Sequence, residues 1–266
     1  MTAVPKAAEP LLLRDDRGGI VTLTLNRPAQ RNALSVALMA ALQAELDAIA
    51  GDRSVKVVVI AGAGPGFCGG HDLKEMRATP RRQAYEALFA QCSRLMLTLT
   101  RLPQPVIARV HAIAAAAGCQ LVATCDLAVA AESARFAVNG VNIGLFCSTP
   151  MVALTRAIGR KPAMEMLLTG EMIDARTALS YGLVNKVVPD GELDNAVAAL
   201  AARIVNKSPY ALKVGKEAFY KQAELGLEQA YAYASEVMTE NMLARDAEAG
   251  IDAFIAKKPS PAWEGR

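Results

Sequence analysis

The chain has 266 residues, of which 53% are hydrophobic and 21% charged, and its formal net charge is +3. These values are typical of a globular protein with a sizeable core, whereas the small charge argues against nucleic acid as a partner. No apolar run approaches the roughly 18 residues that a membrane span needs. Five cysteines without C-x-x-C spacing, and an N-terminus (MTAVPKAAEP) without an apolar or Arg-rich segment, predict reduced thiols and a cytoplasmic location.

The first quarter of the chain predicts a hairpin, a helix and a buried strand. Residues 11–14 and 20–26 are expected to pair, because apolar residues and threonines alternate in the second segment. Ser35 is a typical N-cap for a helix that runs to Ala50 with leucines at helical spacing. Residues 57–60 form a β-branched apolar run suited to a buried strand.

A glycine-rich turn follows that strand in VKVVVIAGAGPGFCGGHDLKEM, residues 55–76. Glycines let the backbone turn sharply and approach a ligand, and Asp72 is placed to cap a helix that begins at Leu73. Such a turn points unpaired backbone N–H groups at one place, which suits a developing negative charge on oxygen. A plain structural loop is the alternative. The run also spells G-x-G-x-x-G, but no second strand ending in an acidic residue follows, which disfavours a nucleotide cofactor.

A second turn of small residues has the same setting. After a helix over 81–101 and a strand over 106–110, four alanines and Gly118 precede a short helix over 119–124. Two such turns would place two backbone donors on one oxygen, which is an oxyanion hole. The alternative is that small residues only let this helix pack closely on a sheet.

The rest of the chain becomes helical after Pro150. Extended pieces are expected over 127–131, 136–144 and 184–188. Helices are expected over 151–158, 161–169, 174–181, 193–206, 209–223, 228–245 and 247–257. The whole is an α+β pattern, which some schemes call α/β.

Five blocks of sequence carry a resemblance to a known family: LNRPAQRNALS, VKVVVIAGAGPGFCGGHDL, GCQLVATCDLAVAAESARF, LLTGEMIDARTALSYGLVNKVVP and GIDAFIAKKPSPAWEG. Over about residues 11–266 the chain resembles the enoyl-CoA hydratase/isomerase (crotonase) superfamily, and within it the subgroup of enoyl-CoA hydratase domain-containing protein 3. The resemblance implies a spiral of ββα turns over residues 1–200 with the acyl-CoA site, and a helical trimerisation region over 201–266. It also implies a homo-oligomer (a trimer, or a hexamer built as a dimer of trimers) and an acyl-CoA thioester as substrate. Coenzyme A would be part of that substrate, with no other cofactor, no metal, no nucleic acid and no membrane partner.

The resemblance also assigns roles to residues. The backbone N–H groups of His71 and Ala117 would hold the thioester oxygen as an acyl-CoA becomes enolate-like. Phe254 and Lys257 match residues that reach the adenine bound by a neighbouring subunit. The other substrate-binding positions carried over are Arg31, Ala33, Gly70, His71, Asp72, Leu73 and Lys74.

The chain departs from the family at both catalytic glutamates. Gln120 occupies the first position and Gly140 the second, within FAVNGVNIGLFC. An amide has no titratable proton near neutral pH, so Gln120 can orient a water molecule but cannot be its base. Each lost acid–base group typically costs about 100- to 10,000-fold in rate, so we expect hydration to be slow.

Other side chains are candidates for the missing proton transfer. The His71 imidazole would lie beside the oxyanion, and the alternative is that only its backbone matters. The Cys147 thiol would need a base to become a nucleophile. Glu75 is expected to face solvent, and His111 to be a hydrogen-bonded core histidine.

The sequence therefore predicts an acyl-CoA-binding member of this family, of the kind named enoyl-CoA hydratase and connected with fatty-acid metabolism, that stabilises an enolate without the usual glutamates. One alternative is isomerisation, thioester hydrolysis or a retro-type cleavage at the same site. The other is a protein that binds acyl-CoA without catalysis.

Overall fold

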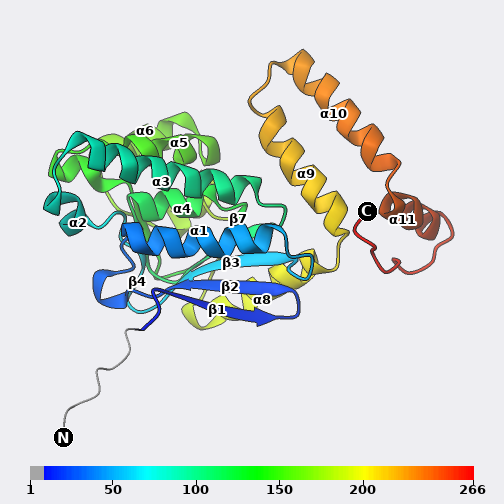
Figure 1. Ribbon diagram of the computed structural model, residues 1–266, viewed down its shortest axis with the longest axis horizontal. Helices are drawn as coiled ribbons and strands as arrows, with labels where there is room; N and C mark the ends of the chain where they lie inside the picture. The colour runs from blue at the N-terminus through cyan, green and yellow to red at the C-terminus, as the bar shows by residue number, and fades with distance from the viewer. Residues whose placement is uncertain (1–8) are drawn as a thin grey trace, which may run out of the picture.

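The computed structural model describes residues 9–266 (Figure 1). The sequence analysis predicted no targeting segment at the N-terminus. That prediction concerns mainly residues 1–8, which lie outside the described residues. Within residues 9–266, strands form a six-stranded sheet in the order β1-β2-β3-β5-β7-β10 and a four-stranded sheet in the order β4-β6-β8-β9. No helix of this part of the chain is long and apolar enough to cross a membrane.

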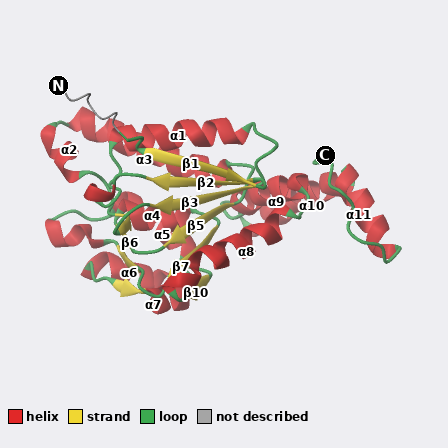
Figure 2. Ribbon diagram, turned by 90° about the horizontal axis from the view of Figure 1, so that it is seen from below, coloured by secondary structure: helices red, strands yellow, loops and turns green. Residues whose placement is uncertain are grey.

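The six-stranded sheet opens with the predicted hairpin and continues with parallel strands (Figure 2). Its strands are β1 (Leu12–Arg17), β2 (Ile20–Leu25), β3 (Val57–Gly62), β5 (Val106–Val110), β7 (Leu127–Ala131) and β10 (Lys186–Val188). Every residue of β3 is buried. The reason is that α1 (Val36–Ala50) and α3 (Arg82–Arg101) cover one face of the sheet and α8 (Leu193–Val205) the other (Figure 1).

The second sheet is made of very short strands. They are β4 (Gly66–Cys68), β6 (Ile113–Ala115), β8 (Arg135–Ala137) and β9 (Ile173–Asp174), and the first three run parallel. Each of β4, β6 and β8 follows one strand of the first sheet and precedes a helix or helical turn, so the chain winds as a spiral of ββα units. The predicted α+β class with its ββα spiral is confirmed.

Two local predictions were wrong. The segment 136–144 is extended only at β8, because residues Asn139–Ile143 form a 3-10 turn, η2, that ends at Gly144 with φ of +78°. The helix α4 (Ala117–Thr124) begins at Ala117 rather than at Cys119, since the positive φ of Ala116 already turns the chain into the helix.

The remaining helices finish the spiral and form an extension. Those of the core are α2 (Leu73–Ala78), α5 (Ser148–Ala157), α6 (Arg160–Thr169) and α7 (Ala175–Tyr181). The chain then continues into α9 (Pro209–Gln222), α10 (Leu227–Met242) and α11 (Arg245–Ile255), which project away from the sheets (Figure 1). Residue 200 lies within α8, so the projecting arm starts after α8. The domain division at residue 200 stays a prediction.

One buried ionic cluster fixes α9 to the core. The Lys216 Nζ lies 2.7 Å from Asp126 Oδ2 and donates to the carbonyls of Leu99 and Gln104 at 2.9 and 3.0 Å. The Tyr220 hydroxyl donates to Asp126 Oδ1 at 2.8 Å. These contacts join α9 to the end of α3 and to the strand β7 that follows Asp126.

Candidate active site

Three turns follow the carboxyl ends of the parallel strands β4, β6 and β8. They contain Gly70 and His71, then Ala116 and Ala117, and finally Gly140. Because neighbouring parallel strands end at the same edge of a sheet, these turns lie next to one another. The topology thus brings together the residues that the sequence singled out in separate stretches.

The first two turns are in direct contact. A Cβ added at Gly70 would lie 3.0 Å from the Ala116 Cβ and 3.4 Å from the Ala117 nitrogen, and Gly70 has a φ of +96°. A Cβ at Gly118 would collide with the Cys68 carbonyl oxygen at the end of β4. Glycine is therefore required at both places, and the two turns approach as closely as backbones can.

Each of these turns leaves one backbone N–H free. Ala117 is the first residue of α4, where no helical acceptor exists. His71 pairs with Leu34 in an isolated bridge whose hydrogen bonds run from Leu34 N to Gly70 O and from Asp72 N to Leu34 O. Neither N–H, of His71 or of Ala117, has an acceptor among residues 9–266. Two amide donors therefore remain unpaired at adjoining turns.

The residue that precedes the second donor is strained. Ala116 has φ of +48° and ψ of −116°, a backbone conformation that residues with a Cβ rarely adopt. Such a residue costs about 1–3 kcal/mol. Its N–H donates to Ala137 O at 2.8 Å and its carbonyl accepts from Gln120 N at 3.0 Å, so β8 and α4 hold it in place.

The first donor is held by the residue after it. Asp72 caps α2 by accepting from the N–H groups of Lys74 and Glu75 at 3.1 and 3.2 Å, and its other oxygen accepts from Arg27 Nη2 at 2.9 Å. Burial raises the pKa of Asp72, but Arg27 and the α2 amides outweigh it, so that pKa falls below its usual value and the carboxylate is ionised. Glu75 is exposed as predicted, with its carboxylate bound to Val36 N at 3.0 Å.

Asn32 has a positioning role that the sequence analysis did not find. Its side chain is fully buried. Its Nδ2 donates to the carbonyls of Ala63 and Gly66 at 2.8 Å, and its Oδ1 accepts from Arg27 N at 2.8 Å. Asn32 thereby ties the glycine-rich turn to the loop before α1. The only signal in the sequence was its place in the block LNRPAQRNALS.

The His71 imidazole is buried rather than turned to solvent. Its ring meets the Phe89 ring of α3 edge-on, with centroids 5.8 Å apart. Both ring nitrogens are buried and make no hydrogen bond of good geometry among residues 9–266, although the Leu34 backbone approaches the ring closely enough to affect its pKa. Burial lowers the pKa of His71, although the Leu34 backbone and the Glu75 carboxylate raise it in part. The ring is therefore neutral at neutral pH.

Gln120 also carries a buried polar atom without a partner among the described residues. It is only 5% exposed, and its Oε1 is buried with no hydrogen-bond donor among the described residues. Gln120 is the fourth residue of α4, one turn after Ala117. It can orient a ligand or a water molecule there.

The third turn is closed around Gly140. The Gly140 N–H donates to Cys147 Sγ at 3.3 Å, and its carbonyl accepts from Leu145 N at 2.9 Å. A Cβ at Gly140 would lie 2.5 Å from the Leu145 carbonyl oxygen. This conformation has no room for a glutamate at residue 140. Burial raises the pKa of the Cys147 thiol, and the hydrogen bond from the Gly140 amide offsets only part of that rise. The thiol is therefore protonated at neutral pH and a poor nucleophile.

The residues predicted to bind coenzyme A divide into two groups. Arg31 and Ala33 lie against the first turn, since Gly69 N donates to Arg31 O at 2.8 Å, and exposed Leu73 and Lys74 begin α2 beside it. Phe254, 84% exposed, lies on α11, and α11 is far from α2 in both views (Figures 1 and 2). Phe254 and the nearby Lys257 therefore do not reach this site within one chain.

His111 lies just after the end of β5, and its ring is hydrogen-bonded to the glycine-rich turn. The His111 Nε2 is 2.8 Å from Gly64 O, so the predicted hydrogen bond is present, but His111 is only half-buried rather than a core residue. Within residues 9–266 no cluster of three or more His, Cys, Asp or Glu side chains could hold a metal ion.

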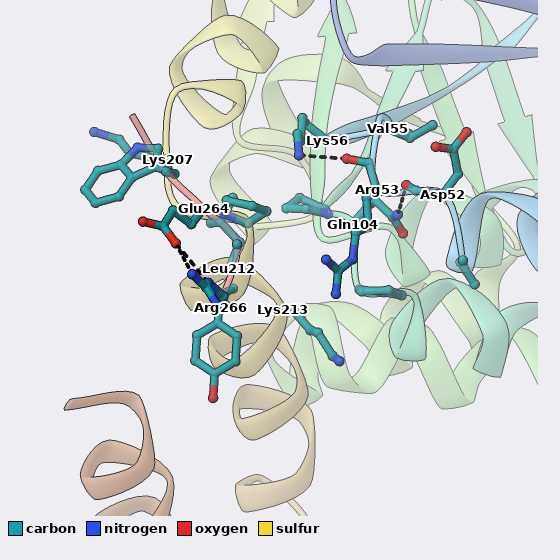
Figure 3. A pocket seen from close by; sticks show the side chains of 18 residues that line it. Asp52, Arg53, Val55, Lys56, Gln104, Lys207, Leu212, Lys213, Glu264 and Arg266 are labelled. Carbon is teal, nitrogen blue, oxygen red and sulfur yellow. Dashed lines mark hydrogen bonds and ion pairs between the residues drawn. The ribbon is translucent and has the colours of Figure 1, made fainter. Parts of the chain in front are cut away.

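A separate cavity lies elsewhere on the molecule (Figure 3). This cavity of about 420 Å³ is bordered by the end of α1, residues 103–105, the first turn of α9 and residues 263–266. It lies at the amino ends of β3 and β5, whereas the three turns follow the carboxyl ends of β4, β6 and β8. It is thus separate from the candidate active site.

Comparisons with known proteins agree with one another. A family model described as enoyl-CoA hydratase/isomerase matches residues 15–266. The solved enoyl-CoA hydratase of Mycobacterium smegmatis is 56% identical with a TM-score of 0.94, over 96% of this chain and 99% of that one. Human "enoyl-CoA hydratase domain-containing protein 3, mitochondrial" is 46% identical over 92% of this chain and 80% of that protein. The 2,3-dehydroadipyl-CoA hydratase of Escherichia coli is 35% identical, over 97% of this chain and its own full length.

Proposed function

Because this chain belongs to the enoyl-CoA hydratase/isomerase family, we propose that it binds an acyl-CoA thioester and stabilises the enolate of that thioester at the amides of His71 and Ala117. The observation that carries this proposal is the pair of unpaired N–H groups at two touching turns. A thioester oxygen between them would accept two hydrogen bonds that strengthen as negative charge develops. One such donor typically contributes about 3 kcal/mol to the transition state.

Coenzyme A would lie along the loop before α1 and the start of α2. Arg31 and Lys74 are exposed beside the first turn and carry the positive charge that phosphate groups need. The exposed apolar residues of the projecting helices, such as Leu227 and Phe254, support a homo-oligomer in which one copy covers another. A trimer or a dimer of trimers, a cytoplasmic location and a role in fatty-acid metabolism stay predictions; the human relative's name places that protein in mitochondria.

Efficient hydration of an enoyl-CoA is not part of this proposal. Gln120 has no proton to exchange near neutral pH, and the closed turn at Gly140 leaves no space for the second carboxylate. An enolate chemistry without added water, such as isomerisation, fits these residues better. Binding without catalysis is the second candidate, favoured by the same lack of carboxylates.

The proposal is tested with a 3-ketoacyl-CoA, whose enolate absorbs in the near ultraviolet. Saturating wild-type protein should raise the enolate fraction, and a thioether analogue that lacks the thioester carbonyl should bind at least about tenfold more weakly. Ala117→Pro removes one donor at a helix position that accepts proline and should lower the enolate fraction, with a melting curve as the control for folding. Equal binding of thioester and thioether with no enolate absorbance would contradict the proposal.

A further inference from the structure

We infer that the cavity of Figure 3 is a second binding site, which takes an anion with two linked phosphate groups. The anion would be an inorganic polyphosphate or the diphosphate of a nucleotide. The cavity lies between the core and the projecting arm, at the amino ends of β3 and β5, and it shares no residue with the proposed thioester site. The inference therefore stands independently of the proposed function.

The first argument is an excess of positive charge around one hollow. Two of the charged side chains in the lining, Arg266 and Glu264, pair with each other at 2.8 Å. Asp52 is the one remaining side-chain carboxylate. Against it stand four cations that have no ion-pair partner among residues 9–266, namely Arg53, Lys56, Lys207 and Lys213. The lining thus has as large an excess of positive charge as the whole chain, whose formal net charge is +3.

The second argument is that these cations come from two separate parts of the chain. Arg53 and Lys56 belong to the segment between α1 and β3, whereas Lys207 precedes α9 and Lys213 lies on it (Figure 3). Charges of one sign around a hollow repel one another, and walls of low dielectric constant concentrate their field in the space between them. A bound anion would relieve this repulsion on both sides at once and would join the arm to the core.

The third argument is that the wall formed by residues 263–266 is firmly held. The carboxylate of Asp246, only 4% exposed, accepts from the Glu264 N–H at 2.7 Å. The indole N–H of Trp263 donates to the Asn206 carbonyl at 2.9 Å. These bonds fix the wall to the start of α11 and to the end of α8. The cavity is therefore formed before a ligand enters, as most small-molecule sites are.

The size and the charge of the cavity favour linked phosphates. Its volume of about 420 Å³ is that of a small-molecule site. A carboxylate carries one negative charge, whereas a phosphate ester carries about 1.5–2 at neutral pH, so two linked phosphates match the excess. The guanidinium of Arg53 can bind a phosphate through two parallel hydrogen bonds. The rings of Tyr210 and Trp263 also line the cavity, so a nucleotide base would have a stacking partner.

Calorimetric titration tests this inference. Pyrophosphate is added to wild type, to the double variant Arg53→Gln/Lys213→Gln and to Lys161→Gln, at low ionic strength, where exposed charges are least screened. Wild type should bind one pyrophosphate per chain. The double variant should bind it at least about tenfold more weakly, because two charge-assisted contacts are lost. Lys161→Gln, which removes an exposed charge of α6 outside the cavity, should bind like wild type.

A titration with ADP distinguishes the two sources of the phosphates. Binding of ADP about tenfold or more tighter than pyrophosphate would identify a nucleotide whose base stacks in the cavity. Binding of ADP no tighter than pyrophosphate would identify the phosphates alone as the recognised group. Either result supports the inference, provided that the double variant weakens it.

Hydrogen exchange locates the bound anion, because the proposed coenzyme A groove is also positively charged. Pyrophosphate should slow exchange at residues 50–56, 207–213 and 263–266 and leave residues 27–33 and 70–78 unchanged. A melting curve without anion is the control for folding, and Lys207→Gln provides the same comparison if the double variant does not fold.

Three results would overturn the inference. They are the absence of saturable pyrophosphate binding, equal binding by wild type and the cavity variants, and slowed exchange confined to residues 27–33 and 70–78. None of them bears on thioester binding at the amides of His71 and Ala117, so the proposed function would stand. Loss of thioester binding would in turn leave the anion site untouched.

Discussion

Arg27 and Asp72 form an ion pair with a 2.9 Å separation, and their side chains are only 17% and 15% exposed. Arg27 also donates to the Ala33 carbonyl at 2.7 Å. The pair thereby joins the loop after β2 to the residue that follows His71. The position of the first amide donor thus depends on a charge pair outside the turn itself.

Removing this pair should destabilise the protein and loosen the donor. Arg27→Met leaves the Asp72 carboxylate mostly buried with only the α2 amides as partners, which should cost about 1–3 kcal/mol in the free energy of unfolding. Urea unfolding at pH 7 measures this cost, with Arg17→Met, an exposed arginine of β1, as the control. An Arg27→Met variant as stable as the control would contradict the account.

The same pair predicts a pH dependence. The folded-state pKa of Asp72 lies below the usual value of 3.8 for an aspartate, so its stabilisation is present above that value and is lost as the pH falls through the folded pKa. Wild type should therefore lose more stability than Arg27→Met between pH 5 and strongly acidic solution. If the urea midpoints of the two proteins fall by the same amount across this range, Asp72 does not contribute to the pH dependence of stability.

Ala116→Gly should stabilise the protein. Relief of the positive φ is worth about 1–3 kcal/mol, and the entropy that glycine loses on folding offsets about 0.5–1 kcal/mol of it, so a net gain of about 1 kcal/mol is expected. Ala115→Gly, in the regular strand β6 just before it, is the matched control and should be destabilising. Thermal melting distinguishes the two, and an equal loss in both variants would show that Ala116 is not strained.

Gly140→Ala should be clearly destabilising, because its Cβ would lie 2.5 Å from the Leu145 carbonyl oxygen. Overpacking of this kind costs about 1–3 kcal/mol. Gly191→Ala is the control, since a Cβ at Gly191 would meet nothing within 4 Å. Wild-type stability for Gly140→Ala would mean that the turn opens readily and that a glutamate could be restored there.

Lys216→Met should release α9 from the core. The substitution leaves Asp126 without its ammonium partner in a mostly buried place and removes a donor from two carbonyls, which should cost about 3 kcal/mol or more. Hydrogen exchange over residues 209–222 should accelerate more than exchange in β3. Lys213→Met, on the same helix and exposed, is the control and should change neither measurement.

The sequence predicted the long elements and the two donor turns, because both have strong local signals. Ser35 and Asp72 cap the helices that follow them, and runs of small residues mark the turns at residues 69–70 and 114–118. The short strands β4, β6 and β8 have three residues each, too few for a period of two to be seen, so only β8 was partly anticipated.

Features that depend on distant residues escaped the sequence analysis. Asn32 binds carbonyls more than 30 residues away, and the lack of space at Gly140 arises from a carbonyl on the far side of its turn. The burial of the His71 ring depends on α3. The resemblance implied a backbone role for His71, but only the packing against Phe89 and Leu34 shows that its imidazole is buried.

The most direct test of the central claim, enolate stabilisation without the usual acid–base pair, is crotonyl-CoA hydration by wild type and Gln120→Glu. Gln120→Glu restores one carboxylate with almost no change in shape and leaves the closed turn at Gly140 intact. Wild type should hydrate slowly or undetectably, and Gln120→Glu should be faster by about 10- to 100-fold. Wild-type hydration with an ordinary kcat of about 1–1,000 per second would contradict the account, because some other group would then be the base.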